Sequence, residues 1–148
     1  MECKHALQEA AGDLDKACGI LQERGLAKAE KKMDRVALQG LIEAYVHPGG
    51  RLGAMVELNC ESDFVAQTNE FKALAHDLAL QVAASAPQFI SPEEIPQGAD
   101  LNPEEVCLLA QPFIKDQGRR ISDIIADVSA KVGEKVAVSR FIRFELCK

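Results

Sequence analysis

The sequence predicts an α+β protein: a small helical module, a linker, and a core in which helices pack on one face of a three-stranded antiparallel sheet. Three patterns carry this prediction. A β-hairpin pattern spans residues 40–60, two amphipathic helix patterns cover 62–84 and 121–132, and residues 135–147 alternate with a period of two. A hairpin and a distant third strand share one apolar face, which the helices are expected to cover.

The hairpin pattern comes first in the predicted core. GLIEAYV (residues 40–46) is β-prone, HPGG (47–50) has turn chemistry, and RLGAMVELNC (51–60) alternates. Glu57 and Asn59 fall on one face of the second strand. The apolar face carries Leu52, Ala54, Val56, Leu58 and Cys60.

A single long helix is predicted from Ser62 to about residue 84. Its apolar stripe consists of Phe64, Phe71, Ala75, Leu78 and Val82. On this pattern alone Phe64 belongs in the core, and Asp63 is a first-turn charge or a cap. Further on, a short helical turn is expected near Asn102 or Pro103.

Later segments complete the predicted core. Residues 121–132 form a helix with an isoleucine and valine stripe, which Gly133 ends. Residues 135–147, KVAVSRFIRFELC, form a long strand.

The N-terminal region is predicted to be a separate module. Residues 1–25 hold two short helix patterns, with Asp13 as the cap of the second helix and Gly25 as its end. Residues 26–36 are charged and poor in large apolar side chains, which predicts a solvated linker. The core domain is then residues 37–148.

Composition narrows the possible functions. Hydrophobic residues make up 47% of the 148 residues, enough for a packed core. The net charge of −6 argues against direct nucleic-acid binding. The sequence has no apolar run of 18 residues, so a membrane-spanning helix is not expected. Five cysteines, an odd number without C-x-x-C spacing, indicate free thiols in a reducing compartment.

Motifs for catalysis and for cofactors are not found. The sequence has neither a glycine-rich phosphate loop nor a G-x-S-x-G elbow, and His5, His47 and His76 are scattered, which argues against a metal site. Cys60 precedes a helix start, where a thiol nucleophile would have a lowered pKa. Its place on the apolar strand face favours a buried, inert thiol. We therefore expect neither an enzyme nor a cofactor.

VELNCESDFVAQTNEF (residues 56–71) resembles the signature of the elongation factor Ts family, with Ser62 in place of the usual threonine. Two further blocks are similar to that family in the same order. They are MECKHALQEAAGDLDKACGILQERGLAKAEKK at the N-terminus, and LLAQPFIKDQG followed by VGEKVAVSRFIRFEL in the C-terminal half.

The resemblance implies a guanine-nucleotide exchange factor that binds elongation factor Tu and promotes release of GDP and Mg²⁺ during translation elongation. Asp63 and Phe64 would project into the partner's nucleotide-binding domain, close to its Mg²⁺ site. Ser62 and Val65 would belong to the same contact, while Cys60 and Phe71 would support it. The resemblance thus implies an exposed Phe64, whereas the helix pattern predicts a buried one.

The resemblance also implies an overall organisation. Residues 1–25 would be a ubiquitin-associated-like module without its first helix, and residues 37–148 the family's core and dimerisation domain. The loop from Pro96 to Glu105 is shorter than the family's helical insertion, and Cys147 replaces a glycine.

With one core unit, the chain is expected to form a homodimer in a bacterial-type cytoplasm or in an organelle matrix. Two alternatives stay open. One is a ribosome-associated or structural relative that keeps the fold without exchange activity, and the other is a thiol enzyme that uses Cys60.

Overall fold

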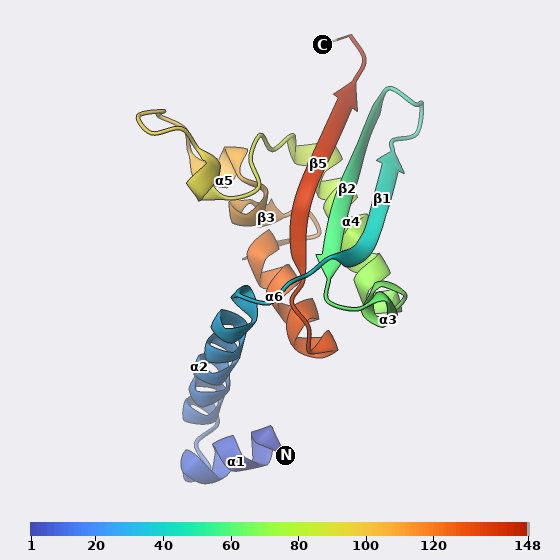
Figure 1. Cartoon of the computed structure of the whole chain (residues 1–148). Coiled ribbons are helices and arrows are strands. Elements are labelled where there is room, and N and C mark those ends of the chain that lie inside the picture. Colours follow the sequence, from blue (N-terminus) through green and yellow to red (C-terminus); the bar gives the residue numbers. More distant parts are fainter. Residues whose placement is uncertain (148) are drawn as a thin grey trace. The chain divides into compact units, whose positions relative to one another are not determined.

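Two units with separate interiors make up the chain, residues 1–35 and residues 36–148. The computed structural model describes residues 1–147, apart from the side chains of Leu26 and Ala29. The first unit is helical, and the second consists of a sheet with its helices (Figure 1). The α+β class and the three-stranded antiparallel sheet are confirmed.

Alanines form the interior of the first unit. Helix α1 (Glu2–Glu9) packs on helix α2 (Leu14–Met33), with Ala6, Ala10 and Ala17 buried between them. Asp13 caps α2 as predicted, because its carboxylate accepts hydrogen bonds from the backbone N–H groups of the second and third helical residues at 3.0 and 3.2 Å. The ubiquitin-associated-like character of this unit stays a prediction.

Helix α2 is longer than expected. The predicted end at Gly25 is wrong, because α2 continues to Met33, through most of the stretch predicted as a linker. Residues 27–33, AKAEKKM, are strong helix formers, and together they outweigh the roughly 1 kcal/mol that an interior glycine costs. Lys28 also forms an ion pair with Glu2 of α1, which ties the added turns to the first helix.

Strand β2 (Leu52–Cys60) is the centre of the sheet. It pairs on one side with β1 (Gln39–Val46) and on the other with β5 (Ala137–Glu145), both antiparallel. The predicted apolar face is confirmed, since Ala54, Val56, Leu58 and Cys60 are all buried. Helix α4 (Asn69–Ser85) covers this face (Figure 1).

A β-bulge changes the alternation of β5. Leu58 of β2 pairs with Val138, and the residue before it, Glu57, pairs with Arg140. Ser139 is therefore the extra residue of the bulge. Val138 and Phe141 therefore both face the core, whereas strict alternation would place them on opposite faces. The Ser139 hydroxyl donates to the Asn59 side chain of β2, which fixes the bulge to the central strand.

The helix predicted from Ser62 is interrupted after one turn. Helix α3 (Asp63–Ala66) ends before Thr68, which caps α4. The Thr68 hydroxyl donates to the Val65 carbonyl at 2.7 Å and accepts from the Phe71 N–H at 3.3 Å, so it closes one helix and opens the next. The rest of the predicted stripe is confirmed as core: Phe71, Ala75, Leu78 and Val82 are buried.

The segment between α4 and β5 folds against α4. It contains short helical turns at Pro92–Glu94, at α5 (Pro103–Val106) and at Leu108–Ala110, then the ribbon of β3 (Pro112–Phe113) and β4 (Asp116–Arg120). Asn102 caps α5 as expected. Helix α6 (Ile121–Val132) ends at Gly133, as predicted, with φ of 73°. The β3–β4 ribbon was not expected, because KDQG predicts only a turn.

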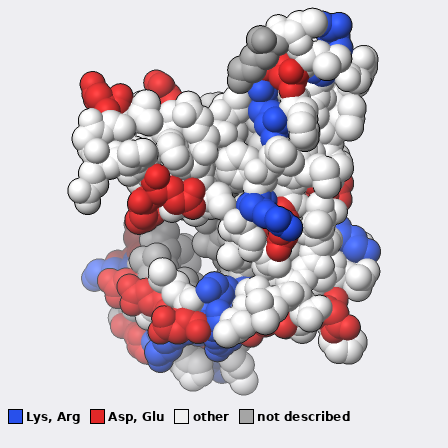
Figure 2. Space-filling view, turned by 45° about the horizontal axis from the view of Figure 1, so that its top comes forward, with Lys and Arg blue, Asp and Glu red and all other residues white. Residues whose placement is uncertain are grey.

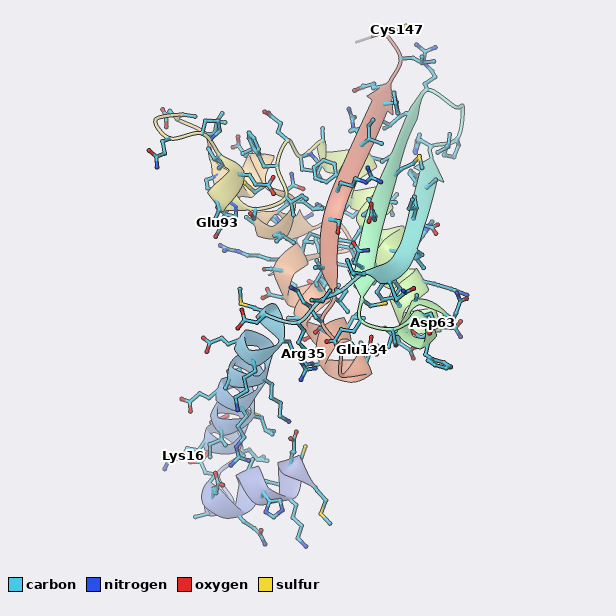
Figure 3. The ribbon with its side chains drawn as sticks, in the orientation of Figure 1. Lys16, Arg35, Asp63, Glu93, Glu134 and Cys147 are labelled. Atoms are coloured by element: carbon cyan, nitrogen blue, oxygen red, sulfur yellow. The ribbon has the colours of Figure 1, made fainter. Side chains whose placement is uncertain are left out.

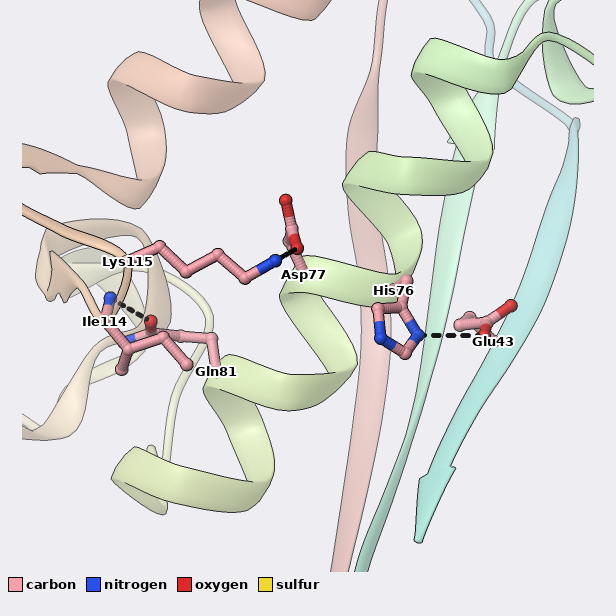
Figure 4. Close-up of polar contacts among 6 residues, drawn as sticks. All are labelled: Glu43, His76, Asp77, Gln81, Ile114 and Lys115. Atoms are coloured by element: carbon pink, nitrogen blue, oxygen red, sulfur yellow. Dashed lines mark hydrogen bonds and ion pairs between the residues drawn. The ribbon is translucent and has the colours of Figure 1, made fainter. Parts of the chain in front are cut away.

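Polar contacts hold α4 to its neighbours on both sides (Figure 4). The fully buried Gln81 side chain accepts from the Ile114 N–H at 2.9 Å, and Lys115 pairs with Asp77 at 2.5 Å, so the β3–β4 turn is fixed to α4. On the other side His76 lies 3.5 Å from the Glu43 carboxylate of β1. No helix in the described part of the chain is long and apolar enough to span a membrane.

We predict opposite effects for two Gly→Ala substitutions in the first unit. Gly25→Ala should stabilise α2 by roughly 1 kcal/mol, because Gly25 is inside the helix and an added Cβ meets no atom within 4 Å. Gly12→Ala should destabilise the unit by about 1–2 kcal/mol, because φ there is +85°. Hydrogen exchange of the α2 amides in the full chain measures both. Destabilisation by Gly25→Ala would contradict the continuous helix.

Candidate functional site

The turn after strand β2 carries the residues that the sequence singled out. Cys60 ends β2, Glu61 and Ser62 form the turn, and α3 follows at once. We call residues 61–66 the β2–α3 loop. Ser62 caps α3 by accepting from the Val65 N–H at 3.4 Å. Val65 and Ala66 are buried and anchor the loop on the core.

Phe64 is the most exposed of the six phenylalanines, with 82% of its surface accessible. Its predicted core position, from the helix stripe, is wrong. The interruption of the helix at Thr68 takes α3 out of line with α4, so Phe64 no longer shares the face of Phe71. Leaving such a side chain in water forgoes about 2 kcal/mol of burial, and an aromatic residue that a fold keeps outside is typical of a binding contact.

Asp63 lies beside Phe64 and is also exposed. Figure 3 shows it on the turn at the end of the sheet, at the foot of β2. Within residues 1–147 the Asp63 carboxylate has no hydrogen bond or ion pair. The loop therefore presents an uncompensated carboxylate next to an aromatic ring, a combination that provides both hydrogen bonding and apolar contact to a partner.

Ser62 and Val65 are the other two predicted contact residues, and their side chains face the protein and not the solvent. Val65 is buried, and the Ser62 hydroxyl is already engaged: it accepts from Val65 and donates to the Glu134 carboxylate at 2.6 Å. Both side chains stabilise the loop from within, and their predicted contact with a partner stays a prediction. Cys60 and Phe71, predicted as supports, are fully buried beneath it.

Cys60 is a hydrogen-bond donor in this structure. Its thiol donates to the Ser62 carbonyl at 3.0 Å, across the turn. Burial raises the pKa of the Cys60 thiol, and the negative charge of Glu134 raises it further. The thiol therefore stays protonated at neutral pH, which contradicts the alternative of a thiol nucleophile with a lowered pKa.

Glu134 is a site residue that sequence reasoning missed. One carboxylate oxygen accepts from the N–H groups of Glu61 and Ser62, at 3.1 and 2.9 Å, and the other accepts from the Ser62 hydroxyl. In return the Glu61 side chain accepts from the Lys135 N–H at 2.7 Å. The only signal in the sequence is GEK after the α6 stripe, which does not indicate a partner 72 residues away.

Charges of both signs are interspersed on the surface. On the face that Figure 2 shows, basic side chains lie in small separate groups, several of them beside carboxylates. Among the described residues no group of three or more His, Cys, Asp or Glu side chains is arranged to hold a metal ion.

A second exposed feature is the sheet face opposite α4, which we call the open face. Its residues lie in three rows across β1, β2 and β5: Ile42–Glu57–Arg140, Ala44–Met55–Ile142 and Val46–Gly53–Phe144. Ile42, Val46, Met55, Ile142 and Phe144 are exposed large apolar side chains. Arg140 pairs with Glu57 at 2.6 Å, which leaves the centre and one end of the face apolar.

We predict that three of the five thiols react quickly with a thiol reagent at neutral pH. Cys3, Cys18 and Cys147 are exposed, while Cys60 and Cys107 are buried with raised pKa values. A count of fast and slow thiols in the native chain, then in denaturant, measures this. Cys60→Ala should leave the fast count at three, and a fall to two would mean that Cys60 is reactive.

Comparisons with known proteins agree with the signature at this loop. A family model described as Elongation factor TS matches residues 26–101. The elongation factor Ts of Carboxydothermus hydrogenoformans is 43% identical over 176 aligned positions, which cover 99% of this chain and 81% of the relative. The proteins of the same name from Heliobacterium modesticaldum and Moorella thermoacetica are 45% and 44% identical, with 99% of this chain and 82% and 87% of the relatives covered.

The alignments are longer than this chain of 148 residues, so the relatives carry residues inside the aligned region that this chain lacks. The matched family region includes both the β1–β2 hairpin and the β2–α3 loop with its exposed Asp63 and Phe64. The chain belongs to the elongation factor Ts family.

Proposed function

We propose that this chain is a guanine-nucleotide exchange factor for elongation factor Tu, and that Asp63 and Phe64 are the residues that act on the partner. The observation that carries the proposal is the exposed Asp63–Phe64 pair on a loop fixed to the core, in a member of the elongation factor Ts family. Because the relatives are bacterial, we place this activity in a bacterial cytoplasm.

Exchange requires differential binding and no chemical step. A GTPase holds its nucleotide through a phosphate loop, a lysine and a Mg²⁺ ion. A factor that binds the loosened conformation more tightly than the closed one shifts the GTPase towards nucleotide release. Linkage makes the effect reciprocal, so that nucleotide rebinding expels the factor.

The proposed division of labour follows from the two side chains. Phe64 would insert between apolar elements of the partner, because its ring gains the burial that it lacks in the free chain. Asp63 would accept hydrogen bonds there or compete for groups near the Mg²⁺ ion. A coupling of about 1.4 kcal/mol for each tenfold change in affinity is within reach of one such aromatic contact.

The fixed loop matters for the size of this effect. Ordering a mobile loop during association costs free energy that is subtracted from the binding. Here the turn is bonded to Cys60 on one side and to Glu134 on the other before any partner arrives. The free energy gained by Phe64 is then available for opening the partner.

We further propose that two copies of the chain associate through the open face. Five large apolar side chains are exposed there in a continuous set of strand pairs, and Phe144 alone exposes 66% of its surface. Two such sheets can stack with their apolar faces together, as in a β-sandwich. A second copy presents the same apolar surface, so the contact would use identical patches on both copies.

We predict that the chain speeds GDP release from elongation factor Tu at least tenfold and that Asp63→Ala/Phe64→Ala abolishes this gain. Tenfold corresponds to roughly 1.4 kcal/mol in the barrier. Fluorescent GDP, loaded on the GTPase and chased with unlabelled GDP, gives the release rate directly.

The matched control for this experiment is Asp100→Ala/Leu101→Ala, which removes another exposed acidic–apolar pair from the same unit. With this variant, elongation factor Tu should release GDP as fast as it does with the unsubstituted chain. If the unsubstituted chain binds the partner without speeding release, the chain is a relative that keeps the fold and lacks exchange activity.

We predict that the chain sediments at twice its mass of 16.1 kDa and that Met55→Asp/Ile142→Asp converts it to a monomer. Two charges in the middle row of the open face lose their hydration if a second sheet covers them. Sedimentation equilibrium at tens of micromolar measures the mass, with Leu101→Asp as an exposed apolar control outside the face. A monomeric unsubstituted chain would rule the dimer out.

A further inference from the structure

Glu134 joins the β2–α3 loop to a distant part of the chain. It follows Gly133 directly, where α6 ends, and its own carbonyl accepts from the Ser129 hydroxyl of α6 at 2.6 Å. The backbone of Glu134 is therefore fixed to α6, while its carboxylate reaches the turn after β2. Figure 3 shows the two labelled residues, Glu134 and Asp63, at the same end of the sheet.

The Glu134 carboxylate binds the part of the loop that no regular element supports. The N–H groups of Glu61 and Ser62 lie between the last pair of β2 and the first turn of α3, where neither strand nor helix bonding is available to them. A charged acceptor forms stronger hydrogen bonds with such donors than a neutral one does. Three donors converge on this one half-buried carboxylate.

The contact is reciprocal. It therefore restricts the rotation of the loop as well as its distance from the segment after α6. Glu61 accepts from the N–H of Lys135 while Glu134 accepts from the N–H of Glu61. Side-chain-to-backbone bonds thus run in both directions between residues 61–62 and 134–135. The next residue along the chain is Asp63, and after it comes Phe64, so the exposed pair directly follows the bonded backbone.

We infer that Glu134 is a positioning residue for exchange: its carboxylate fixes the loop backbone and so holds Asp63 and Phe64 in the orientation that the partner binds. The inference rests on the proposed exchange function. Without this carboxylate the loop stays attached through Cys60 and Val65, but the direction of Phe64 is no longer determined.

The first test needs no partner. The chain has no tryptophan, so Phe64→Trp introduces a single fluorophore at the tip of the loop. Its steady-state anisotropy in the full chain reports local mobility. We expect lower anisotropy when Glu134→Ala is added. Glu134→Gln should keep most of it, because the amide oxygen still accepts from both N–H groups and the amide N–H can donate to Ser62.

The matched control is Glu94→Ala, which removes another glutamate whose carboxylate accepts a loop N–H, that of Ile90, at 3.0 Å. This variant should leave the anisotropy of the tryptophan unchanged. Hydrogen exchange of the α4 amides checks that each variant keeps its core. Equal anisotropy in the Glu134→Ala, Glu134→Gln and Glu94→Ala backgrounds overturns the inference.

The second test measures exchange with Phe64 in place. Glu134→Ala should raise the half-saturating concentration of the factor about tenfold, while the release rate at saturation changes much less, because the loop must be ordered on binding. Glu134→Gln should restore most of the affinity. If Glu134→Ala leaves the half-saturating concentration unchanged, the inference is overturned. If the unsubstituted chain does not speed release, the proposed exchange function fails, and the anisotropy still decides whether Glu134 orients residue 64.

Discussion

The packing of α4 on strand β2 is the interaction on which the rest of the second unit depends. Val56, Leu58 and Cys60 of β2 and Phe71 and Leu78 of α4 are buried together, and the other strands and helices add to this pair. Side chains of this size each contribute about 1.5–3 kcal/mol when buried. Because β2 is bonded on both edges, it is also the strand least able to move, and the β2–α3 loop is attached at its end.

The β2–α3 loop is both exposed and rigid, because different residues provide the two properties. The exposed groups, Asp63 and Phe64, make no contact that holds the loop. The residues that do hold it are buried or half-buried: Cys60 at the end of β2, Val65 in α3, and Glu134 in the segment after α6. A fold that used Phe64 itself as an anchor would have to release it before binding. Here the aromatic ring can enter a partner while the loop keeps its bonds.

Local pattern predicted most of the fold, and the failures have physical reasons. The predicted stripes of β2 and α6 are confirmed, because each element turns one continuous apolar face towards the same core. The local pattern predicts a helix end at Gly25, but the summed propensity of the helix formers that follow outweighs the cost of one glycine. The break at Thr68 depends on one hydroxyl bonding in two directions, and the bulge at Ser139 on a partner in another strand. Exposure of Phe64 followed from the resemblance and not from the pattern, while Glu134 needed the three-dimensional fold, since its contacts lie 72 and 73 residues away.

That separation along the chain has a consequence for synthesis. The hairpin and the β2–α3 loop leave the ribosome well before Glu134 and β5, which complete the sheet and fix the turn. A nascent chain that stops short of residue 134 holds β2 with one free edge and a loop without its carboxylate. Contacts of such long range also form slowly, because loop closure must come before they stabilise anything. The hydrogen bonds that hold the backbone before Phe64 are thus completed only once residue 134 has been made.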